Sequence, residues 1–106
     1  MNRSCKVIQI ENLDARRDGV AVVQEGGQVM LRLWGEHDLA TVGLLRTALA
    51  EVLERADDVV VDLREVTFLG SSTMKTLAIG RDLLAERGHT LLVRSPTLRQ
   101  RRLLEI

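Results

Sequence analysis

The middle of the chain contains a continuous run of mostly β-branched residues, Val59-Val60-Val61-Asp62-Leu63. β-branched side chains favour strands, and a run that is apolar at consecutive positions, without strict alternation, is typical of a strand that is covered on both faces. Such strands occur in parallel sheets, whose crossover connections are usually helices. The run therefore predicts the central strand of an α/β domain.

Helical periodicity lies on both sides of this run. In residues 38–55 the apolar side chains follow the i, i+3, i+4, i+7, i+8 spacing of one helix face, at Leu45, Ala48, Leu49, Val52 and Leu53. Residues that recur at roughly helical spacing after the run are Met74, Leu77, Ala78, Leu84 and Ala85. Asp38 and Thr41 can cap the first helix, and Gly88 is well placed to end the second.

Further strands are expected near both ends of the chain. Residues 20–23 and 29–34 form a predicted hairpin around a Gly-Gly turn, and residues 90–94 form a predicted buried strand. Ser95-Pro96 is typical of the start of a last helix. We therefore expect one α/β domain at residues 19–106, with a mixed sheet of four to five strands and three or more helices. Residues 1–18 are expected to form an extension, in which residues 7–10 are a candidate strand.

The composition excludes several classes of binding partner and of chemistry. The 15 basic and 15 acidic side chains cancel, so no overall field steers the protein to nucleic acid or to anionic lipid. The single cysteine, Cys5, cannot form an internal disulfide, and no apolar run approaches the roughly 20 residues that span a bilayer. His37 and His89 are expected at the surface, and neither neighbours a nucleophile or a metal-ligand cluster. We expect a cytoplasmic binding protein without metal, cofactor or enzymatic activity.

A cluster of hydroxyl residues lies where the central strand gives way to the second helix. Gly70, Ser71 and Ser72 occupy this turn, so the free first-turn amides of the helix point toward whatever the serine side chains carry. A phosphate there would gain amide contacts and would add about −1.5 to −2 charges to the local surface. This arrangement predicts a phosphorylation switch for docking. The alternative is that one serine caps the helix.

Two segments resemble the STAS domains of the anti-sigma-factor antagonists. Residues 34–41 (WGEHDLAT) resemble the G-E-L-D segment of that family, in which Asp38 is the acidic residue. Residues 59–72 (VVVDLREVTFLGSS) resemble its central strand and its D-S-S-G or D-S-T-G phosphorylation loop, with Ser71 at the phosphoacceptor position. The resemblance covers about residues 19–105. It implies a protein that binds an anti-sigma factor, often a serine kinase, and that is released when this kinase phosphorylates it.

The resemblance also assigns roles to individual residues and leaves alternatives. Ser71 is the expected phosphoacceptor, with Ser72 and Thr73 as alternatives. The expected partner-binding residues are Glu36, Asp38, Gly70, Ser71, Ser72, Thr73 and Met74. Gly70 replaces the usual aspartate of the loop, and Thr73 replaces its usual glycine. These departures motivate a second interpretation, an unphosphorylated STAS scaffold subunit of a transporter or of a stress-signalling complex. A weak homodimer is a further expectation.

Overall fold

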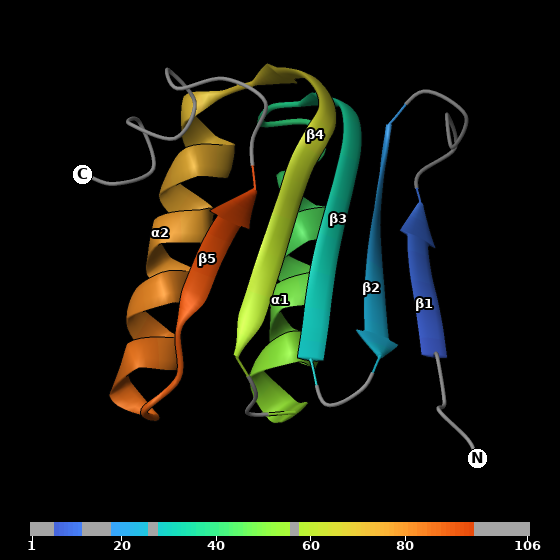
Figure 1. Cartoon of the computed structure of the whole chain (residues 1–106). Coiled ribbons are helices and arrows are strands. Elements are labelled where there is room, and N and C mark those ends of the chain that lie inside the picture. Colours follow the sequence, from blue (N-terminus) through green and yellow to red (C-terminus); the bar gives the residue numbers. More distant parts are fainter. Residues whose placement is uncertain (1–5, 12–17, 26–27, 56–57, 95–106) are drawn as a thin grey trace.

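The computed structural model describes residues 6–11, 18–25, 28–55 and 58–94 of the chain. Its elements in chain order are β1 (Lys6–Glu11), β2 (Gly19–Glu25), β3 (Gln28–His37), α1 (Val42–Arg55), β4 (Val59–Leu69), α2 (Ser71–Glu86) and β5 (Leu91–Arg94). The five strands form one sheet in the order β1-β2-β3-β4-β5 (Figure 1). The β1/β2 and β2/β3 pairs are antiparallel, whereas β3/β4 and β4/β5 are parallel. The predicted α/β class and mixed sheet are confirmed.

The hydrophobic core lies between the sheet and the two helices, which lie side by side on one face of it (Figure 1). Alternate residues of β2, β3 and β4 point into this layer and meet one face of each helix. Its buried members are Val20, Val22, Val29, Leu31, Leu33, Leu45, Ala48, Leu49, Val52, Val59, Val61, Leu63, Val66, Leu77 and Leu84. Burial of each large aliphatic side chain contributes about 1.5–3 kcal/mol, so this layer is the main source of stability.

The two ends of the chain relate differently to the predictions. β1 includes the candidate strand at residues 7–10 and pairs with β2 over its 6 residues. The domain boundary after residue 18 stays a prediction. The helix predicted to open at Ser95-Pro96 lies outside the described residues, which contain α1 and α2.

Both central strands are longer than the sequence pattern predicted. β3 continues beyond Trp34 to His37, and β4 continues beyond Leu63 to Leu69. The two strands stay paired in parallel along these more polar segments, with two register shifts, one between Arg32 and Trp34 and one between Gly35 and Glu36. Periodicity alone misses such segments, because each register shift breaks the alternation of buried and exposed positions.

The start of α1 and the burial of β5 also differ from the predictions. α1 begins at Val42 instead of Asp38, because residues 38–41 form a turn in which the Thr41 amide donates to the Asp38 carbonyl at 3.1 Å. β5 was predicted to be buried, but Leu92 is 61% exposed. Both helices cover the same face of the sheet, so the opposite face of this end strand has no helix of the described chain over it. Gly88 has φ +80° two residues after α2, as its predicted role requires.

Asp62 is a buried carboxylate in the central strand and makes stability depend on pH. Its oxygens accept hydrogen bonds from the Arg64 amide at 3.0 Å and from the Arg64 guanidinium at 2.9 and 3.0 Å. The Arg64 side-chain hydrogen bonds hold the pKa of Asp62 below its usual value, because they favour the charged carboxylate. The folded pKa is therefore lower than the unfolded one, so this contribution is complete above about pH 5 and is lost as pH falls through the folded pKa.

Asp62→Asn should therefore flatten the acid side of the stability curve. The wild-type free energy of unfolding should fall between about pH 5 and pH 2, and the variant should lose less over the same interval. Urea unfolding at a series of pH values measures both curves. Equal slopes for the two proteins would contradict this role of Asp62.

Candidate functional site

The predicted site residues gather where the parallel strands β3 and β4 end. His37 and Leu69 are paired at the last positions of these strands. α1 and α2 begin shortly afterwards, so the amino ends of both helices lie at the same edge of the sheet (Figure 1). In open α/β sheets this edge is the usual place for a binding site.

Gly70 is the single residue between β4 and α2. Its φ of −80° and ψ of 167° are open to any residue, so the glycine is not needed for its backbone conformation. A Cβ placed there would lie 3.2 Å from the Asp38 Cα and 3.3 Å from the Asp38 Cβ. The Gly70 amide donates to the His37 carbonyl at 2.7 Å. The absence of a side chain thus lets the turn after β3 pack against the start of α2, and it brings Gly70 and Asp38 together.

The three candidate phosphoacceptors differ in exposure. Ser71 is exposed, Ser72 is half-buried, and Thr73 is fully buried. The Thr73 hydroxyl has no hydrogen-bond partner within the described structure, and it lies out of reach of a kinase in this fold. Ser71 therefore presents the most accessible hydroxyl of the three.

The serine-cap alternative is wrong for the first turn of α2. The N-cap residue is Gly70, and no side chain caps the helix. The Met74 amide donates to the Gly70 carbonyl at 3.1 Å, and the first turn contains no acidic residue. The amides of the first turn are therefore available to an anion carried by Ser71.

Asp38 and Glu36 stand beside this helix end in different ways. The Asp38 carboxylate accepts a hydrogen bond from the Ala40 amide at 2.9 Å, so it caps the turn before α1 and not α1 itself. Its side chain is half-buried, whereas that of Glu36 is exposed. Both acidic residues lie at the edge of the sheet that carries Ser71, and their part in partner binding stays a prediction.

His37 was predicted to lie at the surface, but it is fully buried beneath the site. Its Nε2 lies 3.1 Å from the Gly19 carbonyl and 2.9 Å from the Trp34 carbonyl, and since both oxygens only accept, Nε2 is the donor. Its Nδ1 forms a hydrogen bond with Thr41 Oγ1 at 3.2 Å. The histidine thus ties the start of β2 to the turn that supports Gly70.

Two exposed apolar side chains lie at this edge in addition to the predicted site residues. Leu39 is 76% exposed in the turn next to Asp38, and Phe68 is 53% exposed three residues before Ser71. Large apolar side chains that stay exposed to water close together on one edge of a sheet are typical of a contact surface. In the sequence, Leu39 and Phe68 could have been recognised as candidates for this surface, because both are large apolar residues that lie outside the periodic core pattern.

The described ranges hold no cluster of three or more His, Cys, Asp or Glu side chains that could bind a metal ion. Neither α1 nor α2 is long and apolar enough to cross a membrane. The fold and the site thus define a small α/β module that presents an exposed serine at a helix amino end. Residues 20–106 match the family described as Mlab, STAS domain, and the chain belongs to the STAS domain family.

Solved structures agree with this assignment. An anti-sigma factor antagonist from Mycobacterium paratuberculosis is 29% identical, with a TM-score of 0.67, and the match covers 85% of this chain and 77% of that one. The structure of Mglu is 25% identical with a TM-score of 0.65 and covers 73% of this chain. This chain spans only 19% of the length of Mglu. No curated protein matches the chain.

Proposed function

We propose that this protein is an anti-sigma-factor antagonist that acts by partner switching in the cytoplasm, without catalysis of its own. The unphosphorylated form binds a kinase-type anti-sigma factor, and phosphorylation of Ser71 ends the complex. Residues 19–106 act as the STAS domain, and residues 1–18 act as an extension. The observation that carries the proposal is the exposed Ser71 at the start of a helix whose first turn has no side-chain cap.

The geometry supports a phosphate that leaves the fold intact. A phosphoryl group on Ser71 lies beside the free amides of α2, where an anion gains about 0.3–1 kcal/mol and up to about 2 kcal/mol when partly buried. The modification therefore changes the surface without opposing the helix. Ser72 is the secondary acceptor, because its side chain is half-buried.

The same surface supports protein docking. The proposed contact surface consists of Glu36, Asp38, Gly70, Ser71, Ser72 and Met74, with Leu39 and Phe68 as its apolar anchors. Thr73 supports this surface from the inside. A dianion at its centre would have to lose its water when an apolar partner surface closes over it, and this desolvation opposes binding.

The phosphorylation step is tested with each anti-sigma kinase of the source organism. Purified protein is mixed with the kinase and ATP, and phosphate is mapped by mass spectrometry. We expect one phosphate on Ser71 and a residual amount on Ser72 when Ser71 is replaced by alanine. The switch is rejected if all of these hydroxyls stay unmodified while the kinase phosphorylates a control substrate.

A second function is favoured by Gly70 and by the match to Mglu. The loop lacks the aspartate of the family motif, and the fold aligns with a small part of a much longer chain in Mglu. An unphosphorylated scaffold subunit of a transporter or of a stress-signalling complex would fit these two observations. This function predicts stable co-purification with a larger complex and no response to ATP, whereas a protein that binds only a soluble kinase excludes it.

A further inference from the structure

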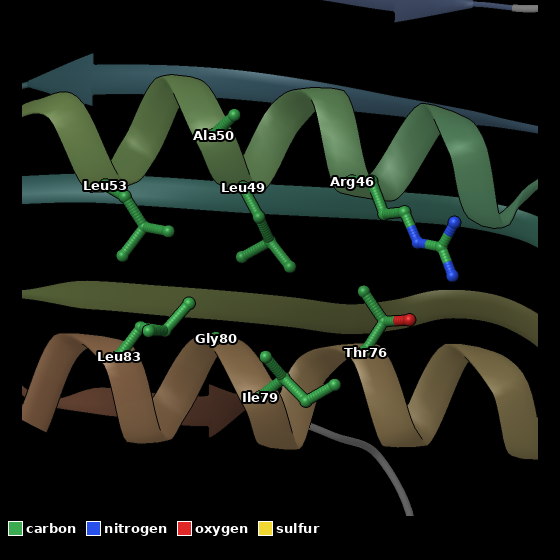
Figure 2. A pocket seen from close by; sticks show the side chains of 8 residues that line it. All are labelled: Arg46, Leu49, Ala50, Leu53, Thr76, Ile79, Gly80 and Leu83. Carbon is green, nitrogen blue, oxygen red and sulfur yellow. The ribbon is translucent and has the colours of Figure 1, made fainter.

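A shallow groove runs between α1 and α2 on the side of the helices that faces away from the sheet. The two helices are parallel to each other, because each follows one of two parallel strands. Figure 2 shows the side chains of both helices converging on the groove, which has a volume of about 210 Å³. Its lining residues are Arg46, Leu49, Ala50, Leu53, Thr76, Ile79, Gly80 and Leu83.

The groove is bordered by apolar side chains that remain in contact with water. Ile79 is 54% exposed and Leu83 is 38% exposed, and Ala50 is exposed on the opposite wall. At the floor, Gly80 has no Cβ, and a Cβ built there would lie 3.0 Å from Leu49 Cδ2. The two helices therefore contact each other at Gly80 and Leu49, and the exposed apolar side chains lie on either side of this contact.

The charges at the two ends of this face have opposite signs. Arg46 and Lys75 are exposed toward the amino ends of the helices, and Glu54 and Glu86 are exposed toward the carboxyl ends. Arg46 and Glu54 flank Ala50 at four-residue spacing, while Lys75 precedes Ile79 by four residues and Glu86 follows Leu83 by three, so all four lie on the groove side. Asp82 follows Ile79 by three residues and lies on the same side, where it forms an ion pair with Arg81 at 3.4 Å. Within the described chain none of these four charged groups has a hydrogen bond or an ion pair. Arg87, also at the carboxyl end, is directed to the Leu53 carbonyl.

We infer that this face binds a second copy of the chain in a two-fold dimer with antiparallel helices. Two copies of this face can be related by a two-fold axis that runs parallel to the helices, and this arrangement brings like charges together. They can also be related by a two-fold axis that runs perpendicular to the helices, and this arrangement brings opposite charges together. Only the second arrangement gives each of these unpaired charges a partner of opposite sign. It places Arg46 opposite the Glu54 of the second copy, and Lys75 opposite its Glu86.

The two charge pairs specify the same axis independently. On α1 the midpoint between Arg46 and Glu54 is Ala50, and on α2 the midpoint between Lys75 and Glu86 falls next to Gly80. Leu49 and Gly80 are in contact, so these two midpoints lie at the same height. The axis thus crosses α1 at Ala50, an exposed residue whose small side chain allows the α1 helices of the two copies to approach closely. Ile79 and Leu83 of α2 then pack on either side of the buried Gly80.

The dimer is tested on the purified protein alone, so its failure would leave the proposed kinase partner untouched. Sedimentation velocity from about 10 µM to about 1 mM covers the range expected for a small interface of this kind. We expect the wild type to shift from monomer to dimer within this range. Ile79→Glu should abolish the shift, whereas the matched control Leu92→Glu, which changes a similarly exposed apolar residue of β5, should retain it.

A charge-reversal experiment tests the geometry. Arg46→Glu with Lys75→Glu makes the face wholly acidic, and Glu54→Lys with Glu86→Lys makes it more basic. Each double variant alone should dimerise at least about tenfold more weakly than the wild type, because four symmetric pairs become repulsive. An equimolar mixture should form a heterodimer, since every pair is then restored. The proposal is overturned if the wild type remains monomeric at about 1 mM, if Ile79→Glu dimerises normally, or if the mixture fails to associate.

Discussion

Ser71→Asp should bind the anti-sigma factor at least about tenfold more weakly than the wild type, whereas Ser71→Ala should bind with nearly unchanged affinity. Aspartate places a charge at the first residue of α2, in the middle of the surface that Leu39 and Phe68 flank. The charge must be desolvated when the partner closes over it. Alanine removes a hydroxyl that does not cap the helix, so little of the binding affinity should be lost. Isothermal titration calorimetry with the purified anti-sigma factor measures both affinities.

The stability of Ser71→Asp separates this effect from misfolding. An acidic side chain near the amino end of a helix adds about 0.3–1 kcal/mol, so the variant should unfold at the same or at a higher urea concentration than the wild type. Thr47→Asp introduces the same charge at an exposed position of α1 and should bind normally. Equal affinities of Ser71→Asp and Ser71→Ala would count against the switch.

His37→Ala should lower the free energy of unfolding by about 2–4 kcal/mol. The substitution leaves the Gly19 and Trp34 carbonyls and the Thr41 hydroxyl without the imidazole, and it opens a cavity at a fully buried position. Urea unfolding at neutral pH measures the loss. His37→Gln should recover part of it, because its side-chain amide can donate to a carbonyl where Nε2 does.

His89→Ala is the matched control for this prediction. His89 is partly exposed and contacts Asp58 across 3.4 Å, so its removal should cost less than about 1 kcal/mol. Hydrogen exchange gives a second readout, since faster exchange at the Gly70 amide is expected in His37→Ala when the turn beneath it loosens. A cost as small as that of His89→Ala, with unchanged exchange at Gly70, would show that His37 does not support the site.

The sheet and the helices could be predicted because their signals are local. The run at residues 59–63 and the helical spacing in residues 38–55 depend only on side chains close in sequence, and both elements formed there. The limits of the elements depend on pairing. β4 extends to Leu69 because it pairs with β3 over this length. The sequence of one strand does not show how it is paired with its neighbour, so the end of β4 could not be predicted.

The site could be predicted only in part for the same reason. The turn at Gly70, Ser71 and Ser72 was identifiable from its place between a strand and a helix, and the resemblance to STAS domains singled out Ser71 as the phosphoacceptor. The contact between Gly70 and Asp38 joins residues far apart in sequence, so only the fold reveals why a glycine suits that position. His37 stands between Glu36 and Asp38 and looks like a surface residue by composition. In the fold its Nε2 is the donor for the Gly19 carbonyl at the start of β2 and for the Trp34 carbonyl of β3, and these partners hold the ring in the interior.

The most direct test of the account begins with a preformed complex between the protein and its anti-sigma kinase. The complex is incubated with ATP or with ADP, separated by size-exclusion chromatography, and the phosphate on each fraction is mapped. With ATP, the wild type should leave the complex carrying phosphate on Ser71, and Ser71→Ala should remain bound under both conditions. Wild-type protein that stays in the complex with Ser71 fully phosphorylated would contradict the account.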